Sequence, residues 1–184
     1  MTESTRLYFI ALLPPAEIQE QITEIKQYFA DKYASRHALT SPPHITLQPP
    51  FRWLPSEVPI LEKAISEFAL TGAPVPVILD GFGAFPPRVI YVRPQKTPEL
   101  MEVKRALTAH LETAIGLIDE KEKQRAFSPH ITVAFRDLKR QAFKAAWPEF
   151  KERPLKERFV ATHLTLLIHD RGEWHIETEF PLGV

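Results

Sequence analysis

The sequence carries one tetrapeptide twice, and this repetition restricts how the chain can fold. Pro-His-Ile-Thr occupies residues 43–46 and recurs at residues 129–132, 86 residues further on. A repeated supersecondary unit favours a structure in which two equivalent units pack against each other. We therefore expect two similar lobes related by a pseudo-twofold axis.

Hydrophobic patterning predicts the same order of elements around each copy. The first half reads as strand, helix, strand, helix and strand over residues 6–13, 15–33, 44–48, 56–70 and 75–82. The second half repeats this order and adds a strand, over residues 88–93, 98–118, 130–135, 137–147, 159–168 and 174–180. Proline pairs mark element boundaries, because proline is excluded from helix interiors and central strands. Asp137 is predicted to cap the last helix and Pro148 to end it.

These elements predict an α/β (α+β) fold. We expect two pseudo-twofold-related lobes, each a mainly antiparallel sheet with flanking helices, around a central cleft. The repeat places lobe 1 at about residues 5–83 and lobe 2 at about residues 86–184. No linker composition separates the lobes, so residues 1–184 are predicted to form a single bilobal domain.

The composition narrows the classes of partner and the cellular compartment. Lys plus Arg and Asp plus Glu are 23 each among 184 residues, which argues against a long electrostatic track for duplex nucleic acid. Cysteine is absent, which excludes disulfides, thiolate nucleophiles and cysteine-ligated zinc. The apolar run over residues 7–13 is too short to span a membrane. We expect a cytoplasmic monomer that does not associate with membranes.

Side chains alternate along a strand, so each repeated motif presents a polar row to one face. The apolar residues between them face the core. The two polar rows are His44, Thr46 and Gln48 in the first copy, and His130, Thr132 and Arg136 in the second. The predicted pseudo-twofold axis brings these rows together across the cleft.

Two histidines that face one phosphate suit in-line phosphodiester cleavage. The reaction needs a base on the attacking oxygen and an acid on the leaving oxygen, and the unperturbed pKa of histidine lies near neutral pH. Hydroxyls of Thr46 and Thr132 can donate to the non-bridging oxygens, and Arg136 can add a planar charged clamp. With these donors no metal or other cofactor is required.

Several further segments match a known family. They are Arg6-Leu7-Tyr8-Phe9-Ile10-Ala11-Leu12, Gly81-Phe82-Gly83-Ala84-Phe85-Pro86 and Arg88-Val89-Ile90-Tyr91-Val92. Together with the two His-x-Thr motifs, they make nearly the whole chain resemble the two-histidine (2H) phosphoesterases, in particular the bacterial RNA 2′,5′-ligase and 2′,3′-cyclic phosphodiesterase branch. The resemblance implies that His44 and His130 are the catalytic acid and base, and that Thr46 and Thr132 bind phosphate. The family commonly continues the first motif with apolar residues into a glycine, whereas this chain has Gln48-Pro49-Pro50-Phe51.

Secondary candidates surround this predicted site. Phe51 and Phe85 border proline turns and are candidates to stack on a base, and Tyr8 and Gln48 are further candidate substrate contacts. Two possible metal sites are alternatives to the metal-independent mechanism. One would use the histidines near the C-terminal hairpin, and the other would hold a metal between the two motif histidines. The hairpin histidines are His163, His169 and His175.

The sequence therefore predicts a metal-independent enzyme that hydrolyses the 2′,3′-cyclic phosphate of a nucleotide or an RNA end. The same groups would serve 2′,5′ RNA ligation by microscopic reversibility. Two alternatives remain open: a module that binds nucleotides or RNA ends without turnover, and a metal-dependent phosphohydrolase. The sequence does not tell which histidine is the acid and which is the base.

Overall fold

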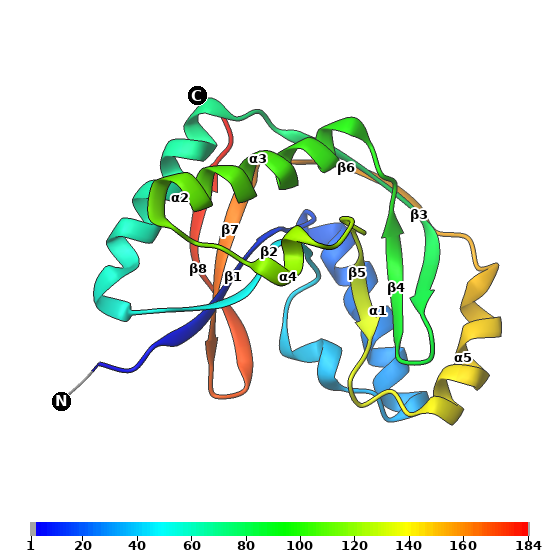
Figure 1. Ribbon diagram of the computed structural model, residues 1–184. Helices are drawn as coiled ribbons and strands as arrows, with labels where there is room; N and C mark the ends of the chain where they lie inside the picture. Colours follow the sequence, from blue (N-terminus) through cyan, green and yellow to red (C-terminus); the bar gives the residue numbers. More distant parts are fainter. Residues whose placement is uncertain (1–2, 184) are drawn as a thin grey trace.

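The computed structural model describes residues 3–183 and consists of two four-stranded antiparallel sheets with flanking helices (Figure 1). This confirms the predicted fold class. The strands are β1 (Arg6–Leu12), β2 (Ile45–Trp53), β3 (Val75–Phe85), β4 (Val89–Pro94), β5 (Ile131–Ala134), β6 (Lys156–Ala161), β7 (His163–Asp170) and β8 (Glu173–Pro181). The helices are α1 (Ala16–Tyr33), α2 (Val58–Thr71), α3 (Pro98–Ile115), α4 (Glu120–Lys123) and α5 (Arg140–Lys151), with 3₁₀ turns at His37–Thr40 and Pro55–Glu57.

The sheets exchange strands between the two repeats. One sheet has the order β2-β1-β7-β8 and the other the order β5-β4-β3-β6. The third strand of each repeat therefore pairs with the first strand of the other, as β7 with β1 and β3 with β4. The sheets thus cross the expected lobe boundary near residues 83–86, because β3 belongs to the second sheet and β7 and β8 complete the first.

The helices cross over in the same way. Helix α1 of the first repeat packs against β5 of the second sheet, and α3 of the second repeat packs against β2 of the first. Figure 1 shows α2 and α3 side by side over the first sheet, and α5 beside the second. One continuous hydrophobic cluster joins buried side chains of both sheets. The two repeats therefore share a core instead of forming separable halves.

The predicted strand over residues 159–168 is wrong as a single element. The chain breaks at Thr162, so that β6 pairs with β3 and β7 pairs with β1 in the other sheet. Val75 lies opposite Ala161, the residue that the repeat offset relates to it. Local hydrophobicity runs on through the break because both strands bury side chains, so the pattern alone does not reveal the change of sheet.

Two other predicted boundaries are wrong. Helix α5 continues past Pro148 to Lys151, and this last turn buries Phe150, whose ring stacks on Phe29 at 4.8 Å. Asp137 does not cap α5, which begins after Lys139. Its carboxylate instead accepts hydrogen bonds from the loop over residues 35–37, which lies before β2, and it thereby ties that loop to the end of β5.

Strands β2 and β5 are edge strands of their sheets. An edge strand tolerates proline and bulges, because one side of its backbone has no ladder to complete. Strand β2 accordingly runs through Pro49 and Pro50 to Trp53, beyond the predicted end at Gln48, with register shifts against β1. No helix within residues 3–183 is long and apolar enough to cross a membrane.

Gly83 lies directly opposite Tyr91 in the β3–β4 ladder, and the tyrosine ring covers its Cα. A Cβ added at Gly83 would lie 2.5 Å from ring atoms of Tyr91. The ring has little room to retreat, because Tyr91 is only 9% exposed and also contacts Phe85 at 4.7 Å between centroids. A side chain at position 83 therefore forces the ring to move.

We expect Gly83→Ala to lower the free energy of unfolding by about 1–3 kcal/mol, the usual cost of overpacking. Urea denaturation followed by fluorescence measures this change. The same substitution in a Tyr91→Val background should cost markedly less, because the clashing ring is gone. An equal cost in the two backgrounds would show that the ring is not the cause.

Candidate functional site

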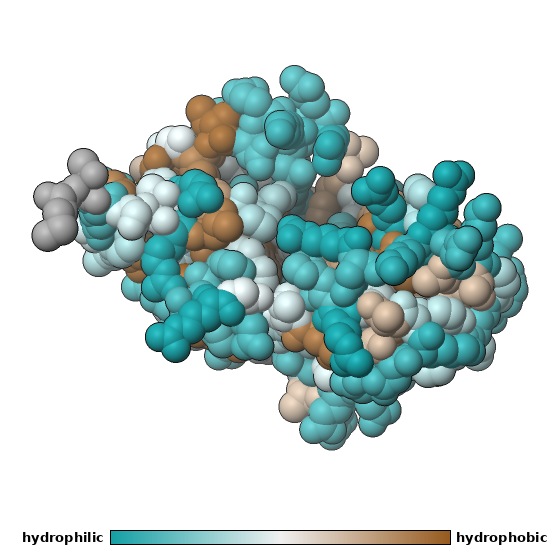
Figure 2. All heavy atoms as spheres, turned by 90° about the horizontal axis from the view of Figure 1, so that it is seen from below, coloured by the Kyte–Doolittle hydropathy of each residue, from teal (hydrophilic) through white to brown (hydrophobic). Residues whose placement is uncertain are grey.

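Both repeated motifs line one cavity of about 250 Å³ between the sheets. The rings of His44 and His130 and the side chains of Thr46 and Thr132 all border it. Figure 2, seen from below the view of Figure 1, shows a recess between two parts of the surface, rimmed largely by hydrophilic residues. The structure thus brings together the four residues that the sequence singles out, with each threonine on an edge strand and each histidine immediately before that strand.

The two histidines are held by the same local hydrogen bond. His44 Nδ1 lies 2.7 Å from the carbonyl oxygen of Pro42, and His130 Nδ1 lies 2.8 Å from that of Ser128, in each case two residues earlier. A carbonyl oxygen can only accept, so Nδ1 carries the hydrogen in both rings. In a neutral ring Nε2 is then left as an acceptor, which is the state that a general base requires.

An aromatic ring from the first strand of each repeat packs behind each histidine. Phe9 of β1 lies 4.7 Å from His44, and Tyr91 of β4 lies 5.5 Å from His130, measured between ring centroids. Both aromatic residues are fourth in related segments, Arg6-Leu7-Tyr8-Phe9 and Arg88-Val89-Ile90-Tyr91. Sequence reasoning missed this pair, although the similarity of the two segments was a usable signal.

Burial controls the protonation of His44. The pKa of His44 is lowered to about 4, chiefly by loss of solvent; the hydrogen bond with Pro42 opposes this shift, and the nearby charges of Lys26 and His130 add to it. The ring is therefore neutral at pH 7 in the protein without ligand. An anionic ligand in the cavity would favour the charged form.

Arg136 and Phe85 also line the cavity, as the sequence predicts. Phe85 is 39% exposed, and its ring meets His130 edge-on at 5.2 Å. Arg136 follows β5 with a positive φ of 59°, a left-handed conformation that turns the chain immediately after the strand. Its side chain is exposed and lies over the ring of Phe135. Phe85 thus offers an accessible aromatic face, and Arg136 a guanidinium, beside the histidines.

The structure places the other three predicted contacts elsewhere. Tyr8 is 1% exposed in the main core, and Phe51 packs against it. Gln48 is 3% exposed and donates to the carbonyl oxygen of Pro49. A register shift in β2 pairs Gln48 with Ile10, whose side chain belongs to the core, so strict alternation from Thr46 predicts the wrong face. Phe9, and not Tyr8, is the residue of β1 that reaches the cavity.

Two lining residues come from segments that sequence reasoning assigned no role. His37 belongs to the turn before β2, and Asp137 accepts its backbone N–H at 2.9 Å. Burial, with a contribution from Arg136, lowers the pKa of His37. Trp174 lies on β8, and its ring packs edge-on against Phe9 at 4.6 Å. His37 is close to His44 in the sequence, whereas Trp174 reaches the site because β8 joins the first sheet beside β7.

The hairpin histidines do not form a cluster. His163 and His169 lie near opposite ends of β7, and His175 lies on β8, where it pairs with Ile168 of β7. Within residues 3–183, no three His, Cys, Asp or Glu side chains lie close enough to hold a metal ion together.

Comparison with known proteins assigns the family. The sequence profile of the 2′-5′ RNA ligase superfamily matches residues 14–173. The chain belongs to this superfamily. It is thus an enzyme of the 2H phosphoesterase type, as its sequence motifs indicate.

Relatives of the superfamily match over nearly their whole lengths. A Bacillus licheniformis protein, provisionally named a phosphoesterase, is 29% identical over 179 residues, which cover 96% of this chain and 98% of the relative. Escherichia coli LigT complexed with 3′-AMP superposes with a TM-score of 0.69 at 21% identity and coverage of 97% and 98%, and so shares the fold. LigT complexed with NADP+ matches with a TM-score of 0.64 at 25% identity over 100% of both chains.

The partly buried, neutral His44 makes stability depend on pH. Because the folded-state pKa lies below the unfolded value of about 6.5, this contribution is complete above pH 6.5 and is lost as pH falls towards 4. We expect wild type to lose about 3 kcal/mol more than His44→Gln between pH 7 and pH 4. Parallel urea denaturation of the two proteins measures the difference, and identical pH profiles would contradict it.

Proposed function

We propose that this protein is a metal-independent cyclic phosphodiesterase that hydrolyses the 2′,3′-cyclic phosphate of a nucleotide or an RNA end to a monoester. The observation that carries the proposal is the pair of histidines that border one cavity, each fixed through Nδ1 immediately before an edge strand of a different sheet. This arrangement can supply an acid and a base on either side of one phosphorus.

The differing environments of the two histidines suggest their roles. His44 is neutral at pH 7 because loss of solvent lowers its pKa, so we assign it as the base that takes the proton of the attacking water. His130 then donates a proton to the ribose oxygen that leaves phosphorus. One P–O bond forms to water, one ring P–O bond breaks, and the product is a 2′- or 3′-monoester.

The remaining groups would bind the phosphate and the nucleoside. The hydroxyls of Thr46 and Thr132 can donate to the non-bridging oxygens, where charge increases in the transition state. Arg136 provides a permanent positive charge at the rim. The exposed ring of Phe85 offers a face on which a base can stack. The complexes of LigT with 3′-AMP and NADP+ are consistent with a nucleotide ligand.

The same site would catalyse strand joining. If the hydroxyl of a second strand replaces water, the base removes its proton and the cyclic phosphate opens onto it. Attack that expels the 3′-oxygen leaves a 2′,5′ linkage, and microscopic reversibility lets the same two histidines cleave it. The superfamily to which the chain belongs is named for this linkage.

We expect turnover of 2′,3′-cyclic nucleotides and cyclic-ended oligonucleotides in excess chelator. His44→Ala and His130→Ala should each lower kcat by about 10²–10⁴ while the fold is retained, since each removes a proton-transfer group. Chromatography of the products measures the rate and identifies the isomer. His163→Ala is the matched control. His163 is the first residue of β7 and does not line the cavity, so this substitution should leave kcat unchanged.

Two results would overturn this proposal. Loss of activity in chelator would indicate a metal-dependent phosphohydrolase. Nucleotide binding that survives both alanine substitutions, with no product formed by wild type, would indicate a binding module.

We also expect a bell-shaped dependence of kcat/KM on pH. Activity should fall on the acid side as His44 becomes protonated, and its pKa of about 4 in the free protein places that limb well below neutrality. It should fall on the alkaline side as the catalytic acid loses the proton that it must donate. A kcat/KM that rises steadily through pH 8 would contradict an acid–base pair of histidines.

A further inference from the structure

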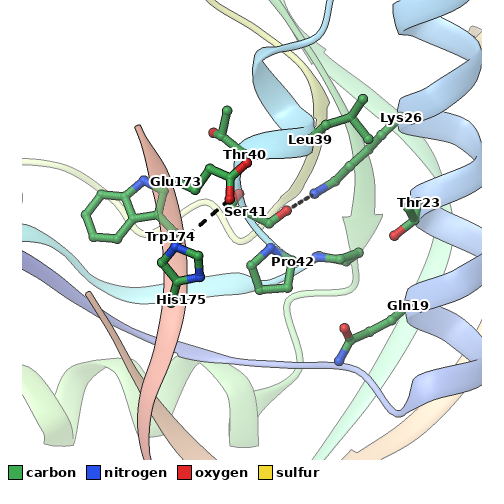
Figure 3. Close-up of a pocket in the computed structure, with 11 residues that line it drawn as sticks. Gln19, Thr23, Lys26, Leu39, Thr40, Ser41, Pro42, Glu173, Trp174 and His175 are labelled. Atoms are coloured by element: carbon green, nitrogen blue, oxygen red, sulfur yellow. Dashed lines mark hydrogen bonds and ion pairs between the residues drawn. The ribbon is translucent and has the colours of Figure 1, made fainter. Parts of the chain in front are cut away.

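A second cavity of about 270 Å³ adjoins the one that holds the histidines (Figure 3). It lies between helix α1, the loop before β2 and the start of β8. Thr40, Ser41 and Trp174 line both cavities, so the two share a wall. The second cavity is therefore a direct neighbour of the first, and the proposed reaction does not use it.

Lys26 of α1 lines this cavity and is 2% exposed. Its Nζ donates to the carbonyl oxygen of Ser41 at 2.8 Å, as Figure 3 shows. An ammonium group has three donors, and this is the only hydrogen bond of Lys26 Nζ among the described residues. None of the ion pairs formed within residues 3–183 includes Lys26. The ammonium group thus has donor capacity left in a cavity open to ligands.

A buried amine without a counter-ion is unfavourable unless something supplies the missing charge. Burial lowers the pKa of Lys26 to about 7, so its ammonium form is only partly populated at neutral pH. An anion that enters the cavity would restore the charged form and gain a charge-assisted hydrogen bond. The geometry therefore suits a ligand that brings its own negative charge.

The rest of the lining is polar. Figure 3 shows Gln19 and Thr23 on the same side of α1 as Lys26, with His175 opposite on β8. The carboxylate of Glu173 is also part of the lining, but its side chain is 67% exposed and lies 4.0 Å from His175 Nε2. This carboxylate is therefore largely solvated and has a cation of its own when His175 is protonated.

We propose that this second cavity binds a phosphate group of the substrate next to the one held by His44 and His130, with Lys26 as its buried cation. This inference rests on the proposed function. It makes the preferred substrate a cyclic-ended strand or a 5′-phosphorylated 2′,3′-cyclic nucleotide. A 2′,3′-cyclic nucleotide without a 5′-phosphate has no second phosphate to place in the cavity.

A purely structural role for Lys26 makes a different prediction. Its hydrogen bond fixes Ser41, and the neighbouring Pro42 carbonyl orients His44. If positioning were its only role, substitution would reduce the turnover of every substrate by the same factor. A comparison of substrates with and without the second phosphate therefore distinguishes a phosphate-binding role of Lys26 from a purely structural one.

The test measures kcat/KM for adenosine 2′,3′-cyclic phosphate with and without a 5′-phosphate. We expect wild type to favour the phosphorylated substrate by about tenfold or more, the value of one charge-assisted hydrogen bond. Lys26→Met should abolish this preference, and Lys26→Arg should retain part of it. Absence of a preference in wild type, or its persistence in Lys26→Met, would overturn the inference.

Lys104→Met is the matched control. Lys104 is a second poorly exposed lysine, and it donates to a carbonyl of β2, that of Leu47 at 2.6 Å. It lies outside the second cavity, in a different space that Thr46 and His130 also border, and it has Glu122 at 3.6 Å as a counter-ion. Its substitution should change kcat/KM for both substrates by the same factor. A loss of the preference in Lys104→Met as well would show that the Lys26 result reflects a general disturbance of β2.

An equilibrium measurement separates this inference from the proposed reaction. Calorimetry should show that wild type binds adenosine 3′,5′-bisphosphate at least tenfold more tightly than 3′-AMP. Lys26→Met should bind the two ligands with equal affinity. This outcome would support the site even if neither cyclic substrate is turned over. Equal affinities in wild type would overturn the site and leave the phosphodiesterase proposal standing.

Discussion

The exchange of strands between the two repeats is the constraint on which the site depends. Because β7 pairs with β1 and β3 pairs with β4, neither repeat can complete its sheet without the other. The exchange leaves β2 and β5 at the edges of their sheets, where each presents one His-x-Thr motif to the shared cavity. The distance between the two histidines is thus set by the shared core and not by a flexible linker.

Edge strands give the site its shape but leave backbone groups without ladder partners. The structure holds β2 from both sides with buried lysines of different helices. Lys26 of α1 donates to the carbonyl of Ser41 before His44, and Lys104 of α3 donates to the carbonyl of Leu47 after Thr46. The chain is therefore held on both sides of the motif, although the pairing of β2 with β1 contains register shifts.

The two histidines have approximately symmetric surroundings, and the departures from this symmetry are the basis of the proposed acid and base roles. Each histidine has the same backbone anchor and an aromatic ring behind it. The surroundings differ, because Trp174 supports Phe9 on one side whereas the exposed Phe85 supports Tyr91 on the other. The proposed in-line displacement needs two similar groups in opposite protonation states, and a duplicated unit with diverged surroundings would supply them.

The sequence by itself determined the repeat, the fold class, the elements around each motif and the polar row of His44, Thr46, His130 and Thr132. These follow from alternation and helical periodicity, which are local properties of the chain. The tertiary structure decided that Gln48 turns inward at a register shift, and that Phe9 faces the cavity instead of Tyr8. Strand β1 is apolar on both faces, so no pattern distinguishes them. Trp174 reaches the site through strand exchange, and Lys26 reaches the neighbouring cavity through helix packing. Such long-range pairing leaves no mark on local sequence.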